Sequence, residues 1–134
     1  MPQAIFVNLP VADLDRSKRF FEGLGFSFNE AFTNDEAAAL VISDTIYAML
    51  HTPESLRRFT KKDIADARAT TEVLLALRVE SRERVDALFD KALAAGGKEQ
   101  RETEDHGFMY GRSFEDPDGH IWEVFWMDPA QLPQ

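Results

Sequence analysis

Apolar positions change their spacing along the chain in a way that predicts alternating strands and helices. Residues 4–9 form a short apolar run that ends at Pro10, which is typical of a strand. After Asp13, a typical helix-capping residue, apolar positions recur at helical spacing until Gly25. We therefore expect a helix at 14–24. The segments 26–32, 37–42 and 45–50 that follow have strand character.

The second half of the chain repeats this order. Residues 72–79 read as a strand, and Ser81 caps a predicted helix that ends at Gly96-Gly97. Strands are then expected at 98–103, 108–114 and from 120 onward. Residues 7–11 align with 75–79, and 45–49 align with 120–124. The sequence thus predicts an α+β fold of two tandem βαβββ modules, with helices outside and a curved mixed sheet around a cleft.

The stretch between the two modules has a different composition. Residues 51–71 show no sustained period and carry five Lys or Arg against three Asp or Glu. We expect one domain over 1–134, with module 1 at about 1–52, a linker or lid at about 53–71, module 2 at about 72–128 and a short C-terminal tail. The lid alternative rests on the apolar side chains Leu56, Phe59 and Ile64, which could anchor the segment.

The clearest chemical signal lies in the last predicted strand. Residues 116–119, Asp-Pro-Asp-Gly, have the composition of a β-turn, in which Gly119 accepts a positive φ. In the strand that follows, Ile121, Glu123 and Phe125 share one face. A carboxylate between apolar neighbours needs a cation, a hydrogen-bond donor or a proton, because its desolvation is costly. Glu123 is therefore the candidate functional residue, and a base if the protein is an enzyme.

The amino-acid composition limits which kinds of molecule the protein is expected to bind. The formal net charge is −9, which disfavours nucleic acid and anionic membrane surfaces as partners and favours a neutral or cationic small molecule. The absence of cysteine excludes disulfides and thiolate chemistry. No apolar run is long enough to span a membrane, and no signal peptide is recognisable, so we expect a cytoplasmic protein.

Two stretches resemble the vicinal oxygen chelate superfamily, which includes glyoxalase I, extradiol dioxygenases and fosfomycin- and bleomycin-resistance proteins. The first comprises residues 9–14, Phe20-Phe21 and residues 24–26, and the second is the segment 114–124. The likeness covers the chain apart from 51–71 and is nearest to small bacterial lactoylglutathione lyase-like proteins. It implies a homodimer and an open sheet face carrying a divalent metal. The family's ligand positions map onto Phe6, Ala48, Leu74 and Glu123, of which only Glu123 is a ligand. We therefore expect no metal and no cofactor, and disfavour a divalent ion.

Six further residues are candidate ligand-binding positions: Asn8, His51, Phe59, Tyr110, Arg112 and Phe125. Asn8 shares a strand face with Phe6, and His51 ends a strand near the expected pocket rim, where it could titrate near neutral pH or rebuild a metal site. Arg112 is expected either to bind a ligand or to neutralise Glu123. Two functions remain open: a lyase or isomerase acting on a small oxygenated metabolite, and a non-catalytic small-molecule or antibiotic binder of the bleomycin-resistance type.

Overall fold

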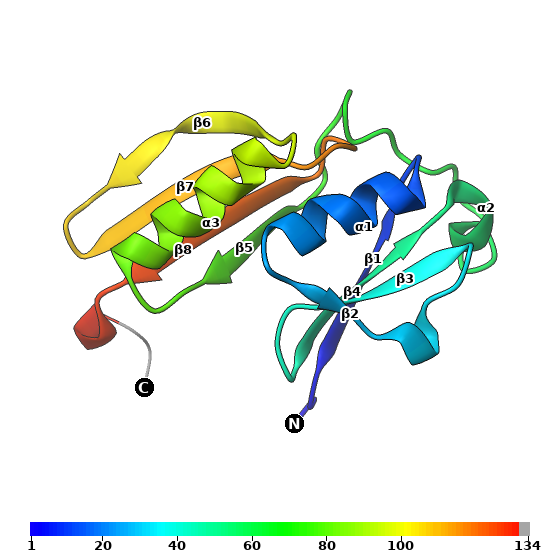
Figure 1. Ribbon diagram of the computed structural model, residues 1–134, viewed down its shortest axis with the longest axis horizontal. Helices are drawn as coiled ribbons and strands as arrows, with labels where there is room; N and C mark the ends of the chain where they lie inside the picture. The colour runs from blue at the N-terminus through cyan, green and yellow to red at the C-terminus, as the bar shows by residue number, and fades with distance from the viewer. Residues whose placement is uncertain (132–134) are drawn as a thin grey trace. The chain divides into compact units, whose positions relative to one another are not determined.

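The computed structural model describes residues 1–131, and the chain divides into two compact units, residues 1–66 and 67–134 (Figure 1). The division falls inside the segment 53–71. Each unit is a four-stranded mixed sheet with one main helix, so the prediction of an α+β fold with two βαβββ modules is confirmed.

The first unit has the strand order β1-β4-β3-β2, in which β1 runs parallel to β4 and the other neighbours are antiparallel. Its elements are β1 (Ile5–Pro10), α1 (Leu14–Gly23), β2 (Ser27–Phe28), η1 (Glu30–Phe32), β3 (Ala37–Val41), β4 (Ile46–His51) and α2 (Pro53–Leu56). The strand expected at 26–32 is shorter than predicted. The side chain of Asn29 accepts a hydrogen bond from the Ala31 amide at 3.0 Å and starts a 3₁₀ turn instead.

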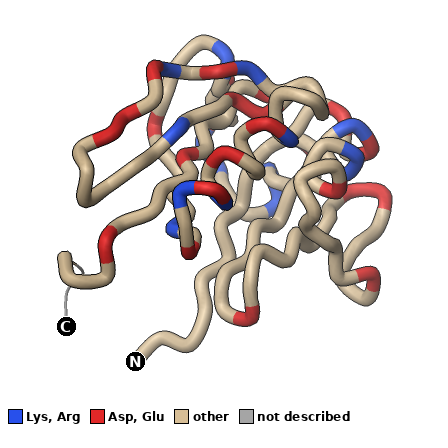
Figure 2. Tube along the Cα trace, turned by 60° about the vertical axis from the view of Figure 1, so that its left-hand side comes forward, with Lys and Arg blue, Asp and Glu red and all other residues tan. Residues whose placement is uncertain are grey.

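The second unit repeats the arrangement with the order β5-β8-β7-β6, and β5 is parallel to β8. Its elements are β5 (Leu74–Arg78), α3 (Arg82–Ala94), β6 (Lys98–Asp105), β7 (Met109–Glu115), β8 (Ile121–Met127) and η2 (Pro129–Gln131). Acidic positions are distributed along both units (Figure 2). Among residues 1–131, no helix is both long and apolar enough to cross a bilayer.

Each main helix covers one face of its own sheet. The side chain of Asp13 caps α1 by accepting from the Arg16 amide at 3.1 Å, and Ser81 caps α3 in the same way through the Arg84 amide. The predicted apolar faces are buried: Leu14, Ser17, Phe20 and Phe21 on α1, and Val85, Leu88, Phe89 and Ala92 on α3. The opposite face of each sheet is the one not covered by its helix, and we call it the open face.

The Asp-Pro-Asp-Gly turn is built around the buried carboxylate of Asp116. Its oxygens accept from the amides of Asp118 and His120, at 2.9 and 3.1 Å, and from the Trp122 indole at 3.0 Å. Burial raises the pKa of the Asp116 carboxyl. Gly119 has φ +89, as the turn requires, and a Cβ there would lie 2.9 Å from the backbone of Ala67 and Arg68. The turn and the start of the second unit are therefore packed tightly together.

Candidate functional site

The open face of the second sheet presents Glu123 between apolar neighbours, as the sequence predicts. Trp122 and Val124 are 2% and 1% exposed and point to the helix side, so Glu123 lies on the other face with Ile121 and Phe125. The strand register places Glu123 opposite Ala76 on β5 and Ser113 on β7. Its side chain is 19% exposed, which leaves it accessible from solvent.

The partner of Glu123 is Arg101, which the sequence analysis did not identify. Arg101 lies on β6 opposite Ser113, and its guanidinium forms ion pairs with both Glu123 and Glu104. The Arg101 guanidinium therefore supplies the cation that the half-buried Glu123 carboxylate requires. The available signal was an arginine within the polar strand 98–103, but the pairing depends on β6 bulges that spacing alone does not reveal.

Tyr110 and Arg112 do not lie beside Glu123. The register pairs Gly111 with Phe125 and Ser113 with Glu123, so the alternate residues Tyr110 and Arg112 point to the helix side of the sheet. There the Tyr110 hydroxyl donates to Asp86 Oδ1 at 2.6 Å, and Arg112 Nη1 donates to the same oxygen at 3.1 Å. The hydrogen bond to Asp86 raises the pKa of Tyr110. The expectation that Arg112 neutralises Glu123 is wrong, and strand alternation is the physical reason.

Phe125 does share the open face with Glu123. A Cβ on Gly111, the residue opposite it on β7, would come within 3.3 Å of Phe125 Cβ. The absence of a side chain at Gly111 gives the Phe125 side chain room on the sheet surface.

The open face of the first sheet carries an aromatic pair. Phe6 and Tyr47 lie opposite each other in the β1–β4 register, and their rings stack with centroids 4.6 Å apart and planes 11° from parallel. Phe6 is 57% exposed. Asn8 and Met49 are the next pair on this face.

Ala48 does not lie on the open face, contrary to the expected site geometry. It is fully buried on the helix side and pairs with Val7. Since residues 7–11 align with 75–79, the pair Asn8–Met49 corresponds to Ala76–Glu123, and Met49 is the true counterpart of Glu123. The predicted alignment was one residue out of register here, which moves a strand residue to the opposite face.

His51 joins three parts of the first unit through hydrogen bonds. Its Nε2 lies 2.8 Å from Asn8 Oδ1 on β1, and its Nδ1 lies 2.8 Å from Ser55 Oγ on α2. The Phe59 ring lies 5.5 Å from the imidazole, centroid to centroid. The structure thus brings Asn8, His51 and Phe59 together. The His51 side chain is buried, and this desolvation lowers its pKa.

Ser55 is a further member of this group that the sequence analysis did not identify. It lies in α2, a single turn whose start is capped by Thr52 and followed by Pro53. Threonine followed by proline is a recognisable helix start. The helix is too short to show a hydrophobic period, so the signal was local only.

Comparisons with known proteins identify the family of this fold. The family model described as Glyoxalase/Bleomycin resistance protein/Dioxygenase superfamily matches residues 4–124. The chain belongs to this superfamily.

Several solved structures resemble the chain along almost its whole length. The hypothetical protein SA1046 from S. aureus is 28% identical with a TM-score of 0.78, and the alignment covers 94% of each chain. A glyoxalase-related enzyme from Fulvimarina pelagi is 26% identical with a TM-score of 0.77, covering 94% of this chain and 88% of that one. A lactoylglutathione lyase from Agrobacterium tumefaciens, at 17% identity, a TM-score of 0.70 and coverage of 94% and 95%, shares the fold. No curated protein matches the chain.

The superfamily's metal does not fit the residues of this member. Its ligand positions, corrected for register, hold Phe6, Met49, Leu74 and Glu123. Two are hydrocarbon side chains, and Phe6 is stacked on Tyr47, while a catalytic zinc or iron site normally needs about three protein ligands of the His, Asp, Glu or Cys type. Within residues 1–131, no three His, Asp or Glu side chains come together to hold a metal.

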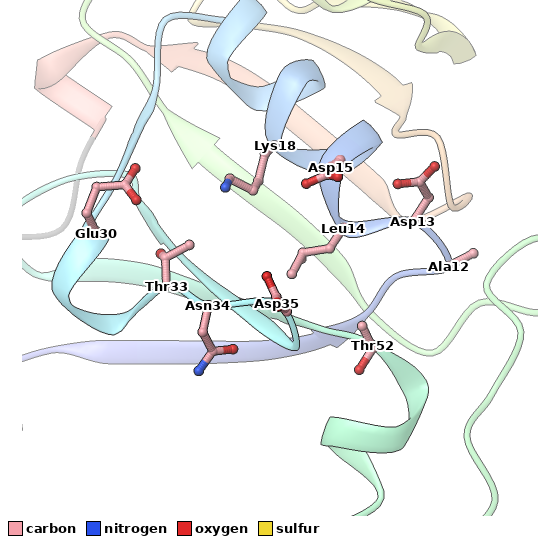
Figure 3. A pocket seen from close by; sticks show the side chains of 10 residues that line it. All are labelled: Ala12, Asp13, Leu14, Asp15, Lys18, Glu30, Thr33, Asn34, Asp35 and Thr52. Atoms are coloured by element: carbon pink, nitrogen blue, oxygen red, sulfur yellow. The ribbon is translucent and has the colours of Figure 1, made fainter.

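A separate polar pocket of 650 Å³ lies in the first unit of this superfamily member. Its walls come from the start of α1 and from η1 with the loop after it (Figure 3). The charged side chains that line it are Asp13, Asp15, Lys18, Glu30 and Asp35. None of the residues predicted as site positions lines it. A neighbouring pocket of 530 Å³ includes Glu36, Thr52 and Arg57.

Proposed function

We propose that this superfamily member binds a small organic molecule without metal chemistry, and that an open sheet face supplies the binding surface. The observation that carries the proposal is the replacement of the metal ligands by apolar side chains, with Phe6 stacked on Tyr47 and exposed by 57%. An exposed aromatic ring held rigid by a stacking partner is a good surface for a planar apolar group, because little side-chain entropy is lost on binding.

The charge around Glu123 favours a neutral or cationic ligand. Arg101 is shared by Glu104 and Glu123, so two carboxylates meet one guanidinium and the group keeps one net negative charge. The whole chain carries a net charge of −9, which adds a field that attracts cations. A ligand with an amine or guanidine group would be attracted by this charge. This is the type of ligand expected of a bleomycin-resistance-like binder.

A lyase or isomerase activity on a small oxygenated metabolite is the second candidate, and the position of Glu123 favours it. The carboxylate lies at the superfamily's ligand position on the open face. Its ion pair with Arg101 is made through Oε2, so Oε1 is the oxygen placed to accept a proton from a substrate carbon. Arg101 would then hold the carboxylate in place during proton transfer.

Ligand screening by thermal shift separates binding from an inert module. We expect neutral and cationic aromatic compounds to raise the melting temperature, because a ligand that binds only the folded state stabilises it. Calorimetry on the best compound should show a loss of affinity of about tenfold for Phe6→Ala. The control Glu102→Gln lies on exposed β6 and should bind as wild type.

Glu123→Gln distinguishes the two candidate functions. It keeps the shape of the side chain and removes the charge. If the protein is a binder, Glu123→Gln should weaken cationic ligands and leave neutral ones unchanged. If it is an enzyme, the variant should bind a substrate but fail to convert it. A screen of such compounds in which none binds the wild-type protein would contradict the proposal.

A further inference from the structure

We propose that His51 is an acid-sensitive latch, which holds the segment 52–59 against the first sheet and releases it when the imidazole takes up a proton. This segment contains α2 and Phe59 and follows β4 directly. The proposal concerns the conformation of the first unit and does not depend on which ligand the protein binds.

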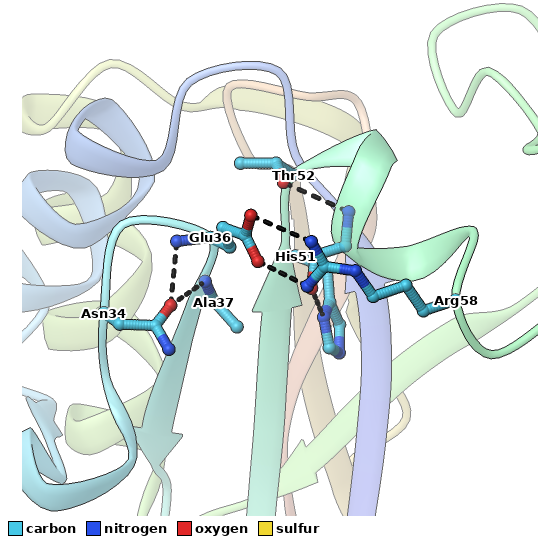
Figure 4. Close-up of polar contacts among 7 residues, drawn as sticks. Asn34, Glu36, Ala37, His51, Thr52 and Arg58 are labelled. Atoms are coloured by element: carbon cyan, nitrogen blue, oxygen red, sulfur yellow. Dashed lines mark hydrogen bonds and ion pairs between the residues drawn. The ribbon is translucent and has the colours of Figure 1, made fainter.

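The hydrogen bonds of His51 define one neutral form of the ring. Figure 4 shows His51 at the end of β4, where the segment that begins with Thr52 leaves the strand. The amide nitrogen of Asn8 donates to the Phe6 carbonyl at 3.3 Å, which turns the Asn8 oxygen toward His51. Nε2 of His51 must therefore carry the proton and donate to Asn8, and Nδ1 must accept from the Ser55 hydroxyl. A second proton would go to Nδ1, and the Ser55 hydroxyl would then have to turn and accept from it.

The side chains in contact with the ring carry no negative charge that could pair with an imidazolium. Asn8 faces it from β1, Ser55 from α2 and the Phe59 ring from the following turn, while its neighbour on β3 is Ala37. None of these four residues is titratable. The residue is only 4% exposed, so water cannot solvate an imidazolium there.

The direction of the pH effect follows from the burial. Burial lowers the pKa of His51 in the closed form, whereas a released ring has the ordinary value of about 6.5. The open form therefore binds more protons as the pH falls below about 6.5. The ratio of open to closed molecules should rise by up to about tenfold for each pH unit, until the pKa of the closed form is reached.

The other side-chain contacts that polar or aromatic residues of the segment make are exposed. The ion pair of Arg58 with Glu36 has side chains that are 60% and 44% exposed, and exposed ion pairs contribute little to stability. Phe59 is 74% exposed. One backbone hydrogen bond, from the Thr52 amide to the Glu36 carbonyl at 2.9 Å, remains at the start of the segment. The His51–Ser55 bond is thus a buried polar attachment of α2 to the sheet, beside the half-buried side chains of Pro53 and Leu56.

Nuclear magnetic resonance on the full chain tests the latch. The amides of Leu56, Arg57 and Phe59 are hydrogen-bonded within the segment, so their exchange reports its opening. After correction for intrinsic exchange, we expect their rates to rise by up to about fivefold between pH 6.5 and pH 5.5. His51 is the one histidine of residues 1–66, so a response there at these pH values is its own. The control His106→Gln, in the second unit, should keep the response.

Two variants decide the outcome. His51→Gln should remove the pH response, and Ser55→Ala should give fast exchange already at pH 7.5 with no further rise on acidification. The proposal is overturned if the imidazole titrates while the amides of 52–59 stay protected, or if Ser55→Ala keeps wild-type protection. A wild-type pH response in His51→Gln would equally overturn it.

Discussion

Glu123 on β8 and Arg101 on β6 form an ion pair on the open face of the second sheet, although β7 lies between their strands. The arginine reaches across Ser113, whose small side chain is buried and bonded to Gln100. This pairing supplies the cation that the partly buried Glu123 carboxylate requires. Arg112 points to the helix side of the sheet instead.

Removal of Arg101 should destabilise the second unit through Glu123. Arg101→Met leaves a carboxylate that is 19% exposed without its cation, and we expect a loss of about 1 kcal/mol in the free energy of unfolding. Urea titration followed by tryptophan fluorescence measures this, because Trp122 and Trp126 both lie in the second unit. In a double-mutant cycle with Glu123→Gln the coupling should be about 0.5–1 kcal/mol. A coupling of zero would show that the pair is not formed in solution.

Asp116 should be essential for the stability of the second unit. Asp116→Ala removes the acceptor of three hydrogen bonds from buried or half-buried donors, including the Trp122 indole. We expect a loss of about 2–4 kcal/mol in the same unfolding experiment. Asp44→Ala, in the exposed turn before β4, is the matched control and should change stability by less than about 0.5 kcal/mol. Equal effects of the two substitutions would refute the role given to Asp116.

Gly119 should tolerate no side chain. Gly119→Ala adds a Cβ at φ +89 that would lie 2.9 Å from the Ala67 carbonyl oxygen and from the Arg68 backbone. The segment 67–68 must then shift, and Arg68 should lose its 2.9 Å hydrogen bond to the Pro117 carbonyl. We expect a loss of more than about 2 kcal/mol by urea unfolding. Gly107→Ala, also at positive φ but with open space around its Cβ, separates backbone strain from the clash and should cost less.

The repeat was predictable from sequence because it rests on strong local signals. Asp13, Ser81 and the apolar helix faces each fix one element, and the Asp-Pro-Asp-Gly turn fixes the start of β8. The side-chain partners across the sheet were harder to predict, because they depend on the register between strands. A slip of one residue exchanged Ala48 for Met49, and the wrong face was assumed for Tyr110 and Arg112. Arg101 meets Glu123 only in the folded sheet, and Ser55 lies in a single helical turn too short to show a hydrophobic period.

The chain is predicted to form a homodimer. Strands β1 and β5 are each an edge of their sheet, and both carry exposed apolar side chains, with Ile5 57% and Leu74 54% exposed. Exposed edges with such residues favour association. Light scattering at micromolar concentration should give about twice the chain mass of 15.2 kDa. A mass of one chain across that range would contradict the prediction.

Binding without metal is the central claim, and calorimetry on metal-stripped protein tests it most directly. Elemental analysis should first show that the purified protein carries no zinc, nickel, iron or manganese approaching one ion per chain. The compound found by thermal shift should then bind the stripped protein with the same affinity before and after zinc, nickel or iron(II) is added, since Phe6, Met49 and Leu74 form no such site. Binding or turnover that appears only after the metal is restored would contradict the account.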